Sequence, residues 1–382
     1  MKISDLDEEQ LQAIFREQVA PRFSATGPAL EAPKLTIVGG QQGSGKTTVV
    51  NQLMAEIENK PSTQRVVVDD LLYFVPGYPE AARQDVLAAQ QNVGDVPDVL
   101  GEALLSHAFE NRHNIILELA NPNAIESFYF EAAEQGYEVD LRLVATRQAD
   151  SWTGVLNRFD RSLDDENSLI HFFEKEQHDK TYSEWPNAVL QAERSHMIDE
   201  ISVVRRDNEL LFQNKRGEKK TSINWLYPVG AYEVFMLERN RGMTMSEDRH
   251  LQEAWAKLIT SRRLANNRAT KDLHLADDWK ALQQTTSFFN VLQPSPHNKP
   301  EQAEKWLKNM RKDMINHMQA DNRIQDDESR QRVWTFTDAV NTRANELVQQ
   351  LANDQTNADS TPSIDVNEKQ KQQKFTIRRF TS

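Results

Sequence analysis

One segment, GQQGSGKTT over residues 40–48, constrains the fold of this chain more than any other feature. It matches the phosphate-binding pattern G-x-x-x-x-G-K-S/T without a mismatch, at Gly40, Gly45, Lys46 and Thr47. Glycines let backbone N–H groups wrap phosphate oxygens, and the N-terminus of a following helix attracts the same negative charge. The apolar run LTIVGG just before the motif is typical of a buried strand. The motif therefore lies between a predicted strand and a predicted helix, which is the context that a phosphate-binding loop requires.

The first half of the chain alternates between strand-like and helix-like patterns. Apolar runs predict strands at 35–40, 64–70, 114–120, 138–146 and 200–207. Helical spacing predicts helices between them at 47–57, 96–111, 125–135 and 151–161. An N-terminal helix should begin at a Ser4 cap and end at Pro21. This alternation predicts an α/β fold, a parallel P-loop sheet with helices on both faces.

Near residue 215 the sequence pattern changes from alternating strands and helices to helices alone. Beyond it, apolar residues recur at helical spacing, and several segments begin with Ser, Asp or Pro in capping positions. A mainly α-helical C-terminal domain is therefore expected over 216–352, after a P-loop domain over 1–215. The polar stretch 353–373 has too few apolar residues to bury a core, so 353–382 should be a disordered tail.

Composition and charge narrow the class of protein. The 382 residues contain no cysteine, which excludes disulfides, thiolate nucleophiles and cysteine metal sites. No apolar run approaches the ~18 residues of a membrane helix, and the acidic N-terminus lacks a signal-peptide pattern, so we expect a cytoplasmic protein with no membrane partner. The net charge of −13 divides into −17 over 1–215 and +4 over 216–382. The acidic half should repel phosphate backbones, which disfavours nucleic acid as a partner.

The phosphate-binding motif predicts ATP and Mg²⁺ as cofactors. Lys46 should reach the β and γ phosphates, and the Thr47 hydroxyl should bind Mg²⁺. The nucleotide-binding set comprises Gly40, Gln41, Gln42, Gly43, Ser44, Gly45, Lys46, Thr47 and Thr48. The guanine-reading pattern N-K-x-D is absent, which argues against a GTPase. A kinase needs a carboxylate beside the γ phosphate, and Asp69 and Asp70 at the end of a predicted strand are the candidates.

These segments, taken in order, resemble the zeta-toxin group of P-loop kinases over roughly residues 5–212. The strand and loop PKLTIVGGQQGSGKTT is the most specific part of the resemblance. The segments VVVDDLLYFVPGY, NIILELANP, SWTGVLNRFDR, EKEQHD and ISVVRRDNELLF are similar to later segments of that family in the same order. The resemblance implies an ATP-dependent kinase that acts as a bacterial toxin or effector, with an antitoxin or chaperone as a protein partner.

The resemblance also implies roles for individual residues. Asp69 aligns with the family's catalytic aspartate and Asp70 with the variable position after it. Glu118 matches a glutamate of the acceptor pocket, in which we also place Asn121 as a substrate residue. Arg158 matches a lid arginine that bridges the phosphates during transfer.

Two departures from the family's pattern bear on the acceptor. Leu72 stands where the family has an arginine, and Leu119-Ala120 stands where it has Gly-Thr. Better-known members phosphorylate UDP-N-acetylglucosamine, whereas related effectors with this fold phosphorylate a ribose hydroxyl of NAD. The resemblance therefore implies a small nucleotide-linked acceptor, a UDP-sugar or NAD. An ATP-regulated binding protein and a polynucleotide kinase are the alternatives. His178-Asp179 is interpreted as a helix-end charge pair, and His171 as a surface or core residue.

Overall fold

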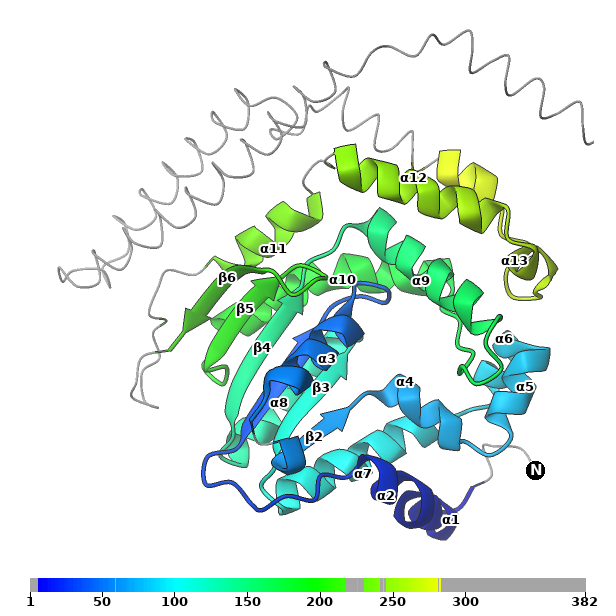
Figure 1. Ribbon diagram of the computed structural model, residues 1–382. Helices are drawn as coiled ribbons and strands as arrows, with labels where there is room; N and C mark the ends of the chain where they lie inside the picture. Colours follow the sequence, from blue (N-terminus) through cyan, green and yellow to red (C-terminus); the bar gives the residue numbers. More distant parts are fainter. Residues whose placement is uncertain are drawn as a thin grey trace, which may run out of the picture.

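A six-stranded sheet forms the centre of the computed structural model, which describes residues 6–58, 60–216, 225, 230–240, 243, 245–280 and 282. The strand order is β2-β3-β1-β4-β5-β6, and all neighbours are parallel except the antiparallel pair β5 and β6 (Figure 1). The strands are β1 (Lys34–Gly39), β2 (Thr63–Val66), β3 (Asn114–Leu119), β4 (Glu138–Val144), β5 (Glu200–Val204) and β6 (Leu210–Lys215). The predicted α/β fold with a P-loop sheet is thereby confirmed.

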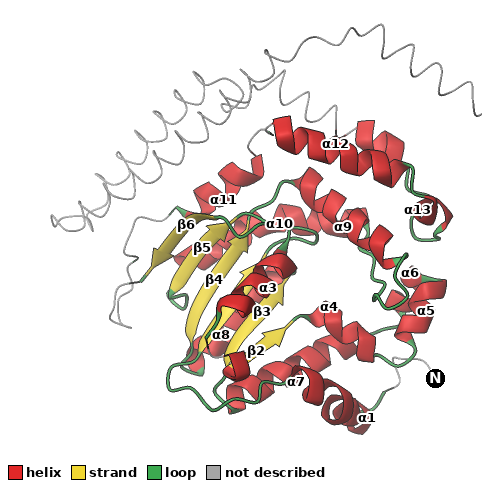
Figure 2. Cartoon of the chain, in the orientation of Figure 1, coloured by secondary structure: helices red, strands yellow, loops and turns green. Residues whose placement is uncertain are grey.

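Helices surround this sheet and dominate the secondary structure (Figure 2). The α-helices are α1 (Glu8–Ile14), α2 (Ala20–Phe23), α3 (Lys46–Glu56), α4 (Val68–Leu71), α5 (Tyr78–Gln84), α6 (Val86–Gln91), α7 (Val96–Glu110), α8 (Ile125–Glu134), α9 (Gln148–Ser162), α10 (Lys175–Arg194), α11 (Ala231–Asn240), α12 (Met245–Ile259) and α13 (Arg262–Asn266). Shorter turns of 3₁₀ or π type lie at Phe15–Val19 (η2), Lys60–Ser62 (η3), Leu72–Phe74 (η4) and Pro122–Ala124 (η5).

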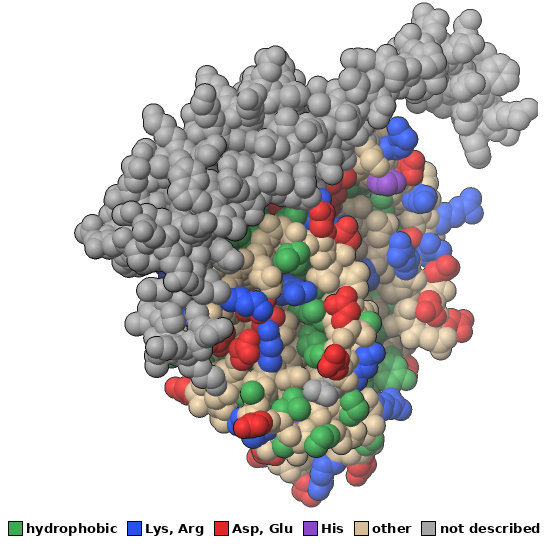
Figure 3. Space-filling model, turned by 60° about the vertical axis from the view of Figure 1, so that its left-hand side comes forward, with side chains coloured by type: hydrophobic (Ala, Val, Ile, Leu, Met, Phe, Trp, Pro, Cys, Tyr) green, Lys and Arg blue, Asp and Glu red, His purple; other side chains and the backbone are tan. Residues whose placement is uncertain are grey.

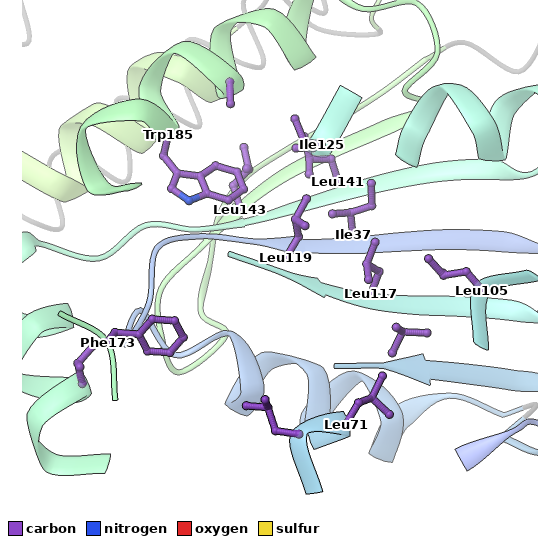
Figure 4. Close-up of a cluster of buried hydrophobic side chains, with 14 of the residues drawn as sticks. Ile37, Leu71, Leu105, Leu117, Leu119, Ile125, Leu141, Leu143, Phe173 and Trp185 are labelled. Carbon is purple, nitrogen blue, oxygen red and sulfur yellow. The ribbon is translucent and has the colours of Figure 1, made fainter. Parts of the chain in front are cut away.

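Alternate residues of the central strands face two different hydrophobic clusters. Val38, Ile116 and Val144 pack with the apolar face of α3, through Val49 and Val50. The residues between them in the strands join the larger cluster, which includes side chains of α7, α8 and α10. Figure 4 shows part of this larger cluster, with Ile37, Leu117 and Leu141 of three neighbouring strands close to Ile125, Leu105 and Trp185. The period of two along each strand therefore places helices on both faces, as predicted.

The N-terminal helix differs from its prediction at both ends. It begins at Asp7, whose side chain accepts a hydrogen bond from the Gln10 backbone N–H in a capping box, and Ser4 lies outside the described residues. Pro21 does not end it, because the chain continues as a π turn and then as α2 to Phe23. Proline is tolerated in the first turn of a helix, where its missing N–H has no intrahelical partner.

Three further elements depart from the sequence-based prediction. The second strand ends at Val66, so Asp69 and Asp70 lie in the short helix α4 and not at the end of a strand. The edge strand β6 was not predicted, because its residues look like a loop without the pairing that β5 supplies. The 20-residue helix α10 was missed too, since it is rich in charge and contains Pro186.

The described part of the C-terminal helical region packs directly on the sheet domain. Helix α11 contacts β5, β6 and α10, and α12 lies along α9 (Figure 1). The proposed boundary near residue 215 falls between β6 and α11, and the predicted tail at 353–382 lies outside the described residues. No helix within the described ranges is both long and apolar enough to span a membrane. Figure 3 shows acidic and basic side chains interspersed over the described surface in that view.

Candidate active site

The loop between β1 and α3 has the backbone that its glycines allow. Gly43 and Gly45 have φ angles of 71° and 106°, in the left-handed region that side chains disfavour. A Cβ on Gly43 would lie 2.0 Å from the Ser151 carbonyl oxygen in α9, and one on Gly45 would lie 2.7 Å from the Arg206 Cβ. Both glycines are therefore required by conformation and by the close approach of neighbouring elements.

Lys46 and Glu118 form a buried pair of opposite charges at the start of α3. The Lys46 side chain is 5% exposed; its Nζ donates to the Gln41 carbonyl oxygen at 3.1 Å and lies 3.8 Å from Glu118 Oε1. The Thr47 hydroxyl donates to Glu118 Oε2 at 2.9 Å. Burial lowers the pKa of Lys46 and raises the pKa of Glu118, even though each offers the other an opposite charge. The two charges therefore remain poorly compensated within the protein.

Asp69 faces an arginine and a histidine across the cleft. Its carboxylate lies 3.5 Å from an Arg158 guanidinium nitrogen on α9, and 3.7 Å from Nδ1 of His171 in the segment between α9 and α10. Burial opposes ionisation, but His171, Arg158 and Lys46 outweigh it and hold the pKa of Asp69 well below its usual range. Asp69 is therefore a carboxylate at neutral pH, and its side chain is 37% exposed.

A cavity of about 350 Å³ joins these groups. The residues predicted for the site that line it are Gln42, Gly43, Gly45, Lys46, Thr47, Thr48, Asp69, Glu118, Asn121 and Arg158. Val68, Asp98, Phe173 and Arg206 are among the lining residues that were not predicted. The Arg158 guanidinium lies over the Phe173 ring, 5.4 Å from its centroid. The cavity therefore combines the phosphate-binding loop with three carboxylates and two arginines.

Four predicted residues do not line this cavity. Asp70 points elsewhere and pairs with Arg65 at 2.7 Å. Gln41 donates through its side-chain amide to the Thr146 carbonyl oxygen, and Ser44 accepts a hydrogen bond from the Thr146 hydroxyl through its own carbonyl. These two residues, like Gly40, shape the loop from behind.

A buried hydrogen-bond chain connects α9 to α10 behind the loop. The Ser151 hydroxyl lies 2.9 Å from His178 Nε2, and His178 Nδ1 lies 2.9 Å from Asp179 Oδ1. Ser151 and His178 are fully buried, and burial lowers the pKa of His178 despite the neighbouring Asp179. The Ser151 carbonyl also approaches the loop at Gly43, so the residue that links α9 to α10 lies where α9 packs on the loop. The predicted pair at a helix end is found near the start of α10, where it also links this helix to α9.

Sequence reasoning missed His171, Asp98 and Phe173. The interpretation of His171 as a surface or core residue overlooked its position beside Asp69. All three come from helices or loops whose spacing carries no recognisable motif, so only the fold brings them to the cleft. A single histidine between two helices belongs to no sequence motif that would predict a site.

The fold and the cleft together define a P-loop α/β protein in which a buried lysine at the end of the loop pairs with a carboxylate on the neighbouring strand β3. The zeta toxin family model matches residues 22–217, which is just over half of the chain. The chain therefore belongs to the zeta toxin family, as the resemblance predicted.

Individual relatives are distant. Toxin zeta of Enterococcus hirae is 20% identical over 191 residues, 49% of this chain and 65% of that protein. The match thus spans slightly less than two thirds of that relative's length. Toxin PezT of Streptococcus pneumoniae serotype 4 is 23% identical over 190 residues, 48% of this chain and 73% of that one. A solved structure from the PezAT chromosomal toxin–antitoxin system of S. pneumoniae superposes with a TM-score of 0.56 at 20% identity. That superposition covers 68% of this chain and 99% of the other, which establishes the shared fold.

Proposed function

We propose that this protein is a kinase that transfers the γ-phosphoryl group of ATP to a hydroxyl group of a small nucleotide-linked molecule. The observation that carries this proposal is the convergence of Asp69 and Arg158 on the cavity that holds Lys46. A carboxylate, an arginine and a P-loop lysine around one cleft are the groups that phosphoryl transfer requires.

The loop residues bind the donor phosphates. Burial lowers the pKa of Lys46, and among the described residues one carboxylate, that of Glu118, lies within 4 Å of its Nζ, so a phosphate oxygen would supply further negative charge. The Thr47 hydroxyl and the Glu118 carboxylate are hard oxygen donors beside the loop, and they suit Mg²⁺. Mg²⁺ typically uses few protein ligands and completes its shell with water and phosphate oxygens. When bound, the ion would neutralise charge on the β and γ phosphates.

Asp69 and Arg158 act on the transferred group. The acceptor oxygen forms a bond to the γ phosphorus as the bond from phosphorus to the β–γ bridging oxygen breaks, and ADP leaves. Asp69, ionised because of its lowered pKa, takes the proton of the acceptor hydroxyl. Arg158 balances the charge on the phosphoryl oxygens and is held at the cleft by its contacts with Asp69 and the Phe173 ring.

The acceptor in this proposal is UDP-N-acetylglucosamine or another UDP-sugar, with NAD as the alternative. Leu72 is 5% exposed and packs in the core, whereas Leu119 and Ala120 line the cavity with apolar surface. An arginine at position 72 or a threonine at position 120 would offer hydrogen-bonding groups that these side chains lack. Asn121 and Asp98 are polar residues that also line the cavity.

We further propose that the protein acts in the cytoplasm as a toxin or delivered effector and binds an antitoxin or chaperone. The support is family membership together with the S. pneumoniae structure, which comes from a toxin–antitoxin system. The domain over 1–215 is the proposed kinase, because every group named above comes from it.

Asp69→Asn tests the proposal, with Asp70→Asn as its matched control. The measurement is transfer of label from γ-labelled ATP to a panel of UDP-N-acetylglucosamine, other UDP-sugars, NAD and short oligonucleotides. Asp69→Asn should lower transfer by about 100-fold or more while ATP still binds, because general-base catalysis contributes on that order. Asp70→Asn should retain transfer, since Asp70 pairs with Arg65 outside the cavity.

Two outcomes would contradict the kinase. If wild-type protein binds ATP but labels no acceptor, an ATP-regulated binding protein becomes the better explanation. If Asp69→Asn and wild type transfer equally well, the carboxylate has no role in the chemistry.

A further inference from the structure

Two neighbouring arginines, Arg262 and Arg263, begin α13 in the C-terminal helical region. Both residues are exposed, but they differ in their contacts. Arg263 forms ion pairs with two carboxylates of the P-loop domain, at 2.9 Å from Asp160 and 2.8 Å from Asp164. Arg262 forms no ion pair with any residue that the structure describes. The zeta toxin family model matches residues 22–217, so Arg263 lies beyond the part of the chain that this model covers.

The contact between Arg263 and Asp160 is bidentate. Nε and a terminal nitrogen of Arg263 donate to the two carboxylate oxygens of Asp160 at 3.2 and 2.9 Å. The Ser261 hydroxyl donates to the same carboxylate. Burial opposes the ionisation of Asp160, but the hydrogen bonds from Arg263 and Ser261 outweigh it and lower its pKa. A bidentate contact between arginine and carboxylate fixes orientation as well as distance.

The C-terminal side of this contact is anchored independently of Arg263. Ser261 is the N-cap of α13 and accepts a hydrogen bond from the backbone N–H of Leu264, which is buried in the core. Trp255 of α12 is fully buried, and its indole N–H donates to the Thr153 hydroxyl of α9 at 2.8 Å. Removing the Arg263 side chain should therefore leave α12 and α13 in place.

The two carboxylates that bind Arg263 lie in the sequence between the two residues that face Asp69. Arg158 precedes Asp160 by two positions on α9, and His171 follows Asp164 by seven. The Arg158 side chain is 46% exposed. Because so exposed a side chain has few neighbours to hold it, the place of its guanidinium depends on where the backbone of α9 lies.

Apolar packing holds the same end of α9 in a less specific way. Phe159 is fully buried, and its ring packs on Phe172 with the centroids 4.7 Å apart. Burial of apolar surface resists separation of the helix from the core, but it is non-directional. Asp160, at the next position, supplies the directional contact, and it supplies it to the C-terminal helical region.

We propose that Arg263 is a positioning residue for phosphate transfer, which holds the end of α9 where Arg158 meets the transferred phosphoryl group. This inference rests on the proposed kinase function and gives the C-terminal helical region a part in it. Arg263 acts through Asp160 and Asp164 and does not touch the substrate. Misplacement of a catalytic group by about 1 Å can cost about 100-fold in rate, so a small shift of α9 is sufficient to slow transfer.

Arg263→Gln tests the proposal, with Arg262→Gln as the matched control at the neighbouring exposed position. Arg263→Lys keeps the charge without the bidentate contact. Transfer from γ-labelled ATP and ATP affinity by titration calorimetry are measured for these variants, and Arg263→Gln is also combined with Arg158→Ala. Amide hydrogen exchange over residues 156–173, without ATP, is the readout that needs no enzymatic activity.

Arg263→Gln should lower kcat by about 10-fold, because a shift smaller than 1 Å costs less than the full effect of misplacement. Its amide exchange over 156–173 should rise, and Arg263→Lys should recover part of both changes. Arg262→Gln should resemble wild type. In the Arg158→Ala background, Arg263→Gln should lower kcat by less than about twofold, because two residues that act through one step are not additive.

Unchanged amide exchange in Arg263→Gln would overturn the proposal. So would raised exchange with transfer at the wild-type rate. An equal loss of transfer with and without Arg158 would overturn it as well, because the effect would then not pass through that arginine. If wild-type protein labels no acceptor, the kinase proposal fails and this role falls with it. The two failures are distinguishable, because failure of the positioning role alone leaves transfer by the wild type intact.

Discussion

Two lysines at opposite ends of the same strand have opposite electrostatic surroundings. Lys34, at the start of β1, lies within 3.5 Å of Glu138, Asp140 and Glu200. Burial lowers the pKa of Lys34, but these three carboxylates outweigh it and the net shift is upward. Lys46 follows the other end of β1, and there burial prevails, so its pKa is lowered.

Two glutamates, Glu200 at the amino end of the sheet and Glu118 at its carboxyl end, show the same contrast as the two lysines. Burial opposes the ionisation of Glu200 as well, but Lys215, Lys34 and Gln213 together lower its pKa. For Glu118 at the carboxyl end of the sheet, burial exceeds the help of Lys46 and Thr47 and raises the pKa. Lys34 and Glu200 at the amino end are therefore held in their charged forms by protein partners, although burial raises the pKa of Asp140 beside them. Lys46 and Glu118 at the carboxyl end, by contrast, keep charges that a ligand can satisfy. Perturbed groups of this kind collect at functional sites.

Lys46→Met should give the largest effect of these variants on activity, and it tests the carboxyl end of β1. Loss of the phosphate-binding charge should lower kcat/KM for phosphate transfer by about 100-fold or more. The free energy of unfolding should change little, because burying Lys46 and Glu118 is costly and removing one charge also removes its desolvation penalty. Transfer assays and urea unfolding measure the two quantities.

Lys34→Met is the control and should behave in the opposite way. It should keep full transfer and lose stability, because three carboxylates lose their shared partner. Equal losses of activity in the two variants would show that the ends of β1 are not functionally distinct.

The same Glu→Gln substitution at the amino end of the sheet (Glu200) and at its carboxyl end (Glu118) should shift the free energy of unfolding in opposite directions. Glu200→Gln should lower the free energy of unfolding at pH 7 by about 1–3 kcal/mol, through loss of charged hydrogen bonds. The folded pKa of Glu200 lies below its usual 4.5, so this stabilisation is present above that pH and is lost as pH falls through the folded pKa. Glu118→Gln should raise stability at pH 7, because the folded pKa of Glu118 lies above 4.5 and its ionisation opposes folding.

Urea unfolding of both variants and wild type from about pH 3 to about pH 8 measures these effects, because this range brackets the usual glutamate pKa of 4.5. The deficit of Glu200→Gln should shrink below about pH 4.5, and the gain of Glu118→Gln should shrink there too. A loss of stability in both variants would contradict the electrostatic difference between the two ends of the sheet.

Lys215→Ala should have the smallest effect on stability. It tests how far the ion pairs at the amino end of the sheet depend on each member; these join Lys34 and Lys215 to Glu138, Asp140 and Glu200. Lys215 is 54% exposed, and its pair with Glu200 at 2.8 Å should contribute less than about 1 kcal/mol to the free energy of unfolding. Thermal unfolding at low and high salt checks this, since an exposed pair should weaken with salt. A loss as large as that of Lys34→Met would mean that the network acts as a single unit.

Much of the fold could be predicted because its signals are local. The phosphate-binding loop and the five parallel strands follow from glycine spacing and apolar runs, and they are found within a few residues of their predicted positions. Asp69 was predicted as a site residue and lines the cleft, although from α4 and not from a strand end. Strand β6 and helix α10 escaped prediction because pairing with β5 and tertiary packing override their weak local patterns.

The contacts around Asp69 could not be predicted from such local signals. Arg158 and His171 are separated from Asp69 by 89 and 102 positions along the chain, yet they lie 3.5 and 3.7 Å from its carboxylate. The packing of α12 on α9 likewise depends on contacts between distant residues, such as that of Trp255 with Thr153.

By itself the sequence determined the phosphate-binding loop, the alternating fold and the family, because each depends on the order and spacing of nearby residues. The tertiary structure alone decided which histidine accompanies Asp69 and which C-terminal helix packs against α9. The strand order is the physical reason, because β1 lies between β3 and β4. That order brings Glu118 of β3 to Thr47 and carries α9, which follows β4, to the edge of the loop.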